Sequence, residues 1–101
     1  MTEAWLLADT VGFAEFFSIS QAKLTRNPEE LAHAKQEVLR VCAGSRKRHV
    51  REGMTAGNGE VGPLYVSMIN EFASEHWDVH RAMDQSPSLA RAVSRIAQIA
   101  Q

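Results

Sequence analysis

One segment, from Pro63 to Met83, constrains the fold of this chain most strongly, because its apolar residues recur with helical spacing. In an α-helix, residues at positions i, i+3, i+4 and i+7 lie on one face. Gly62 followed by Pro63 is typical of a helix start, since the first turn leaves the N–H that proline lacks unbonded. The pattern predicts one amphipathic helix of about six turns. Its apolar stripe contains Tyr65, Met68, Ile69, Phe72, His76, Val79 and Met83.

The length and the composition indicate one folded domain over residues 1–101. A chain of 101 residues with 45% hydrophobic residues is long enough to bury one core. The single cysteine, Cys42, excludes an internal disulfide and is typical of a reducing compartment. No apolar run approaches the roughly 18 residues that cross a membrane, and the N-terminal residues are acidic rather than basic. We therefore expect a soluble cytoplasmic protein without membrane contact.

Three further segments also show helical periodicity. Residues 3–24 are predicted as one kinked helix or two short helices, because Gly12 weakens the middle. Asn27 and Pro28, followed by Glu29 and Glu30, are typical of the start of a second helix. This second helix is expected to end at Gly44 or to continue to about residue 53. A last helix begins at Ser86-Pro87.

No segment alternates apolar and polar residues as a strand does, so the predicted fold is all-α. Four one-sided helices favour a small four-helix bundle-like domain. Four glycines between positions 53 and 62 predict a Gly-rich hinge between the second and third helices. The stripes are narrow and the helices long for so short a chain, which favours a homodimer.

The position of Trp77 favours a protein that binds other proteins. Trp77 falls on the polar side of the predicted helix 63–83, and tryptophan is enriched at the centres of interfaces. Packing of Trp77 within its own chain is the alternative. Our first hypothesis is a non-enzymatic regulatory or adaptor protein that acts through helical surfaces. Its predicted partner-binding residues are Trp77, His80, Glu71, Glu75 and Asp78.

A basic segment supports a second hypothesis, binding of nucleic acid. Residues 40–51 carry a charge of +5, whereas residues 52–84 carry −5 and the whole chain −1. On a continuous helix Arg40, Lys47 and Arg51 would share one side, as a surface that follows phosphates requires. A solvated helix end, or a contact with the acidic segment of a second subunit, explains the same charges. The candidate residues are Arg40, Arg46, Lys47, Arg48 and Arg51.

Catalysis and metal binding have weaker support. His76 and His80 have the spacing with which a helix presents two metal ligands, but the first and last helices contain no histidine to complete a site. Cys42 lies on an apolar helix face, where a thiol is usually unreactive. We therefore expect no enzyme, no cofactor and no metal, with His76 and His80 as the candidate ligands if a metal is bound.

Overall fold

A computed structural model describes residues 3–24, 27–28, 33–56 and 60–100, and this part of the chain is all-helical, without a strand. The all-α fold class is confirmed. The helices are shorter and more numerous than the four predicted. They are α1 (Glu3–Ala8), α2 (Thr10–Phe17), α3 (Ala34–Ala43), α4 (Arg48–Met54), α5 (Tyr65–Glu71), α6 (Val79–Gln85) and α7 (Pro87–Ala100), with a 3₁₀ turn η1 (Gln21–Lys23) and a π-helical turn η3 (Phe72–His76).

The predicted helical segment 3–24 is divided at Asp9 rather than at Gly12. Asp9 is the N-cap of α2, and its side chain accepts a hydrogen bond from the Gly12 amide. A carboxylate at this position bonds an amide that the first helical turn leaves without a partner. The short helices α1 and α2 therefore form, which agrees with one of the two predicted alternatives.

The second predicted helix ends at Gly44, which is the first of its two predicted alternatives, and a separate helix follows. α3 ends at Ala43 and α4 begins at Arg48, with a four-residue connection, residues 44–47, between them. Within the described residues α3 begins at Ala34, and the acidic residues of the predicted helix start, Glu29 and Glu30, lie outside those residues. The continuous helix that would have aligned Arg40, Lys47 and Arg51 is absent.

The glycine-rich segment is held closed at its two described ends. Thr55 pairs with Val61 in an isolated antiparallel bridge, and the Gly62 amide donates to the carbonyl of Met54. Gly62 is buried, and a Cβ there would meet the backbone of residues 53–55, so this close approach requires glycine. Residues 57–59 lie outside the described residues, and the hinge remains a prediction.

The long helix predicted over 63–83 is interrupted after His76. The amide of Trp77 donates to the carbonyl of Phe72 at 2.8 Å, which is the i to i+5 bond of a π-helical turn. The extra residue in this turn rotates the following side chains relative to an α-helical wheel. Asp78 then caps a new helix, α6, by accepting from the amides of His80 and Arg81.

Two groups of buried residues stabilise the body of the molecule, which we define as α1 to α6. The main core is centred on Phe13, Phe17 and Phe72, whose side chains are completely buried and whose rings lie 4.5–5.7 Å apart. A second core joins Ala8, Ala82 and Leu89, from α1, α6 and α7. Trp77 packs against both cores and connects them.

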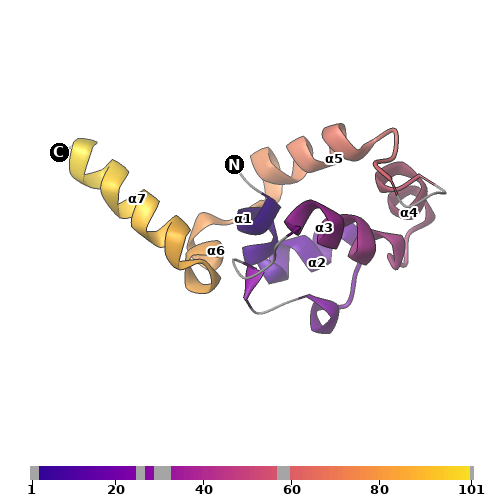
Figure 1. Ribbon diagram of the computed structural model, residues 1–101, viewed down its shortest axis with the longest axis horizontal. Helices are drawn as coiled ribbons and strands as arrows, with labels where there is room; N and C mark the ends of the chain where they lie inside the picture. The colour runs from indigo at the N-terminus through magenta and orange to yellow at the C-terminus, as the bar shows by residue number, and fades with distance from the viewer. Residues whose placement is uncertain (1–2, 25–26, 29–32, 57–59, 101) are drawn as a thin grey trace.

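α7 extends away from this body, as Figure 1 shows at the yellow end of the chain. Its first turns pack on α6 through Leu89, and its last turns lie beside no other element in the view. The molecule is consequently elongated, with extents of 47 × 23 × 22 Å. None of the described helices is long and apolar enough to cross a membrane.

Candidate functional site

An ion pair between the buried Asp9 and the half-exposed Arg81 fixes two helix breaks of the body, at Asp9 and at Asp78, against each other. The Asp9 side chain is completely buried and accepts from Arg81 through both carboxylate oxygens, at 2.7 Å and 3.1 Å. It also accepts from the Asp78 amide at 2.9 Å. Burial by itself would raise the pKa of Asp9, but these hydrogen bonds and that of the Gly12 amide outweigh it and hold the pKa below its usual value.

Gly12 leaves the space that this ion pair occupies. A Cβ at Gly12 would collide with the Asp9 carboxylate and would lie 3.1 Å from Nη2 of Arg81. Any larger residue would therefore push the two charged groups apart. The glycine that weakens helix propensity within residues 3–24 is required here by close packing.

Trp77, the predicted interface residue, is engaged within its own chain. Its indole Nε1 donates to the carbonyl of Trp5 at 3.0 Å, and its ring is partly buried between the two cores. Trp5 in turn donates from Nε1 to the hydroxyl of Ser88 at 3.1 Å, which attaches the first turn of α7 to α1. Trp77 thus packs within its own chain, as the alternative interpretation of the sequence predicted. A partner-binding role for Trp77 remains a prediction.

The other predicted partner-binding residues lie on or next to three elements, α5, η3 and α6. Glu71 and Glu75 are exposed on α5 and η3, and His80 is exposed on α6. Asp78 is half-buried and caps α6. The interruption after His76 therefore divides the acidic flank, which the sequence had placed along one helix.

A mixed-charge cleft of about 410 Å³ opens between α2, α4, α5 and α6. His76 lies at this cleft on the ring of Phe16, with centroids 4.8 Å apart. Its lining contains both acidic and basic side chains, so the charge of the lining selects no single class of ligand. The lining residues are Gly12, Glu15, Phe16, Lys47, His49, Met68, Glu71, His76 and Arg81.

His76 and His80 do not form the helix-borne pair that a metal site would use. His76 ends the π-helical turn, whereas His80 belongs to α6, and the extended residues Trp77 and Asp78 separate them. Among the described residues, no group of three or more histidine, cysteine or acidic side chains has the geometry to hold a metal ion. Their role as metal ligands has no support from this arrangement.

Cys42 is completely buried in the main core. Burial raises the pKa of its thiol to about 12, because the thiolate loses its hydration there. A thiol in this state is a poor nucleophile near neutral pH.

The basic segment forms a well-anchored turn between α3 and α4. The buried hydroxyl of Ser45 donates to the carbonyl of Phe17 at 2.6 Å, and the Arg46 amide donates to that of Ser18. Arg51 donates from Nη1 to the Ser45 carbonyl at 2.7 Å. These bonds fix the turn to the end of α2, where Ser18 has a positive φ of 54°.

The five candidate cations for nucleic acid are in different environments. Arg40 pairs with Glu37 on α3, and Arg48 pairs with Glu52 on α4 at 2.8 Å. Arg46 and Lys47 are exposed on the turn itself. Exposed pairs of this kind contribute little and exchange readily for another anion. The structure thus brings Arg46, Lys47, Arg48 and Arg51 together at one turn, with Arg40 apart on α3.

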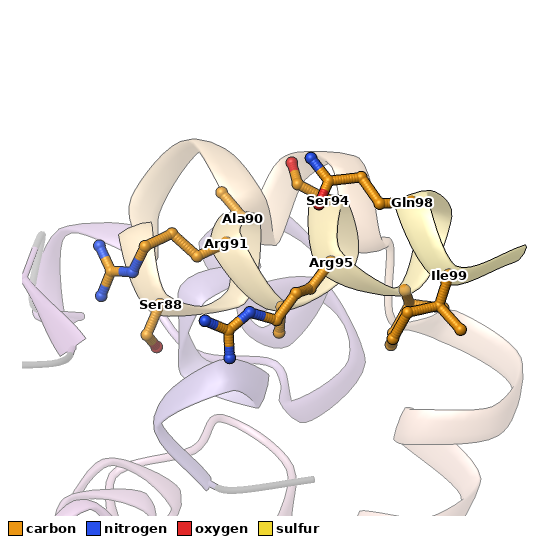
Figure 2. A pocket seen from close by; sticks show the side chains of 9 residues that line it. Ser88, Ala90, Arg91, Ser94, Arg95, Gln98 and Ile99 are labelled. Atoms are coloured by element: carbon orange, nitrogen blue, oxygen red, sulfur yellow. The ribbon is translucent and has the colours of Figure 1, made fainter. Parts of the chain in front are cut away.

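The largest departure from ordinary burial is on α7. Ile96 and Ile99, on adjacent turns, are 67% and 83% exposed, respectively. A broad hollow follows this helix, and each of the residues lining it belongs to α7, so it is an open helix face rather than an enclosed cavity. Figure 2 shows the side chains of Arg91 and Arg95 extending in the same direction along this face.

The sequence predicted this last helix, but Ile96 and Ile99 were not among the predicted site residues. Periodicity shows which residues share a face, and only the position of the helix shows which of them remain uncovered. Comparison of the chain with protein-family models, with curated proteins and with solved structures gives no match.

Proposed function

We propose that this protein is a small non-enzymatic regulatory or adaptor protein that acts by association with another protein, and that α7 is its main contact surface. The observation that carries the proposal is the exposure of Ile96 and Ile99 on a helix that extends away from the body. Apolar side chains of this size are normally buried, and a contiguous exposed set marks an interaction site.

The amphipathic character of α7 supports the same function. Its apolar stripe begins with the buried Leu89 and continues through Val93 to Ile96 and Ile99, while Arg91 and Arg95 lie on the solvated side. A partner that covered the last turns would extend the second core along the same stripe. Amphipathic helices bind protein grooves in this way.

The surface predicted from the sequence becomes a secondary part of this proposal. Glu71, Glu75 and His80 are exposed and accessible to a partner, whereas Asp78 caps α6 and Trp77 connects the two cores. A catalytic alternative has little support, because the only cysteine of the chain is buried and its pKa is raised to about 12.

The bundle-like assembly of helices, the homodimer, the hinge at residues 53–62 and the cytoplasmic location belong to the same proposal. The unpaired thiol of Cys42 is compatible with a reducing compartment. A bundle would be completed when a partner covers α7, since the helices of the body alone leave that stripe open.

Affinity capture from cells that express the protein tests this function. The variant Ile96→Ser/Ile99→Ser should lose bound proteins that the wild type retains, because it removes the exposed apolar groups. The matched control, Ser94→Ala/Gln98→Ala, changes two residues on the opposite face of the same helix and should retain them. Equal recovery with all three proteins would refute α7 as the contact surface.

A second candidate function, nucleic-acid binding, is favoured by the anchored basic turn. Arg46 and Lys47 are exposed on a connection of four residues between two helices, and Arg48 follows at the start of α4. A short connection between two helices is also the arrangement by which helix-turn-helix proteins present a helix to DNA.

Fluorescence anisotropy of labelled duplex and single-stranded oligonucleotides tests this second function. Binding that weakens steeply with salt, and that is lost when Arg46, Lys47, Arg48 and Arg51 are replaced by glutamine, would support it. Absence of binding at low salt would eliminate it.

A further inference from the structure

We infer that the partner of α7 is a second copy of this chain, in a two-fold homodimer in which Arg91 and Arg95 of each copy meet the acidic segment 71–84 of the other. The inference rests on the proposed function, because it names the partner of the same helix.

α7 carries a net positive charge. Residues 86–100 contain two arginines and no acidic residue. Both arginines are exposed, and neither forms an ion pair within the part of the chain that the structure describes. A second α7 packed alone against this helix would bring arginines toward arginines, which opposes simple pairing of two α7 helices.

The body carries the complementary charge, in residues 71–84. Residues 71–84 contain Glu71, Glu75, Asp78 and Asp84, and only one arginine or lysine, Arg81. Arg81 is held by the buried Asp9 and lies 3.6 Å from Asp78, so it is already engaged. Glu71, Glu75 and Asp84 are exposed. A segment with an excess of acidic side chains and a helix that lacks an acid are thus present in the same chain.

Incompletely buried apolar side chains connect α6 with the apolar stripe of α7. Val79 and Met83 of α6 are only partly buried in the second core, and Ile96 and Ile99 lie further along the α7 stripe that contributes Leu89 to that core. α7 extends away from its own η3 and α5, so its last turns lie apart from the acidic segment of the same molecule (Figure 1). A second copy can present that segment to them.

Symmetry explains why a second copy satisfies these requirements. Each molecule supplies one basic apolar helix and one acidic segment, so a two-fold axis generates two identical contacts and leaves neither of them unpaired. A dimer of this kind closes on itself and does not extend into a filament.

Sedimentation velocity of the purified full-length chain over a range of concentrations tests the inference. The wild type should dimerise, and the charge reversals Arg91→Glu/Arg95→Glu and Glu75→Arg/Asp84→Arg should each weaken the dimer by roughly tenfold or more. An equimolar mixture of these two variants should form a heterodimer, because each acidic α7 then meets a basic surface and each basic α7 an acidic one. Circular dichroism confirms that both variants are folded.

Two further variants make the test specific. Arg46→Glu/Lys47→Glu changes the net charge by the same amount as the α7 reversal and should leave the dimer intact. Ile96→Ser/Ile99→Ser should produce a monomer of unchanged helicity. A wild-type dimer that persists in the isoleucine variant, or folded charge variants that do not associate with each other, would overturn the inference.

A wild-type chain that stays monomeric at about 100 µM would also overturn the inference and the proposed homodimer, but not the proposal that α7 binds another protein. In that outcome the capture comparison of the isoleucine variant still decides whether α7 binds another protein. Flotation with anionic vesicles would identify a lipid surface as the occupant instead. If the isoleucine variant retains all the proteins that the wild type binds, and its vesicle binding is unchanged, α7 is refuted as a contact surface.

Discussion

The body and α7 use apolar residues of similar size in opposite ways. Phe72 is completely buried and its ring contacts those of Phe13, Phe16 and Phe17, whereas Ile99 is 83% exposed on the extended end of α7. Burial of the first stabilises the fold. Exposure of the second contributes nothing to the fold of one molecule, and our proposal assigns it to association with a partner.

Replacement of Phe72, in the body, should give the largest effect on the free energy of unfolding. Phe72→Ala removes a ring from the centre of the main core and should lower the free energy of unfolding by about 3–5 kcal/mol. Urea denaturation followed by circular dichroism measures the change. The matched substitution Val66→Ala, on an exposed residue of α5, should change it by less than about 0.5 kcal/mol.

The ion pair between Asp9 and Arg81 should give the next largest effect on the free energy of unfolding, and this effect should depend on pH. Asp9→Asn removes a charged group that accepts four hydrogen bonds from three residues and should cost about 1.5–3 kcal/mol at neutral pH. The folded pKa of Asp9 lies below its unfolded value, so its contribution is complete above the unfolded pKa and is lost as the pH falls through the folded pKa.

Denaturation curves at decreasing pH check whether the contribution of Asp9 to stability is lost as the pH falls. The stability of the wild type should fall faster than that of Asp9→Asn as the pH drops below about 4, and the two proteins should become more alike. A constant difference between them down to acidic pH would mean that the charge of Asp9 contributes no stability.

Trp77 tests whether the connection between the two cores is structural. Trp77→Phe keeps an aromatic ring but loses the hydrogen bond to the Trp5 carbonyl, and should cost about 1 kcal/mol. Trp77→Ala should cost considerably more, because it also removes packing against both cores. A fully stable Trp77→Ala protein that has lost a partner would restore the interface role predicted from the sequence.

The smallest effect on folding should come from α7. Ile96→Ser/Ile99→Ser should change the unfolding free energy of the monomer by less than about 0.5 kcal/mol, because both side chains are already exposed to water. Thermal denaturation of dilute protein measures this. A loss as large as that of Phe72→Ala would show that α7 folds back on its own body.

Much of the fold follows from the sequence because helical periodicity is a local property. The spacing of residues 87–100 and the Ser86-Pro87 start predicted α7 correctly. The all-α class followed from the same signal. The breaks at Asp9 and Asp78 were also within reach, since aspartate is a favoured N-cap residue, although the apolar periodicity across both positions suggested continuous helices.

The π-helical turn explains why the candidate site was less predictable. One additional residue between Phe72 and Trp77 moves Trp77 from the polar side of an α-helical wheel into contact with both cores. The same turn leaves His76 exposed, although the wheel places it in the apolar stripe. A period of 3.6 residues contains no information about such an insertion.

The ion pair between Asp9 and Arg81 has a consequence for how this chain folds during synthesis. Seventy-two positions separate the two residues, and Leu89 of the second core is further along still. Translation adds about 5–20 residues per second. Arg81 and the second-core residues of α6 and α7 are therefore synthesised several seconds after Asp9 and α1. Over that time the early helices expose apolar surface that a nascent-chain chaperone would recognise.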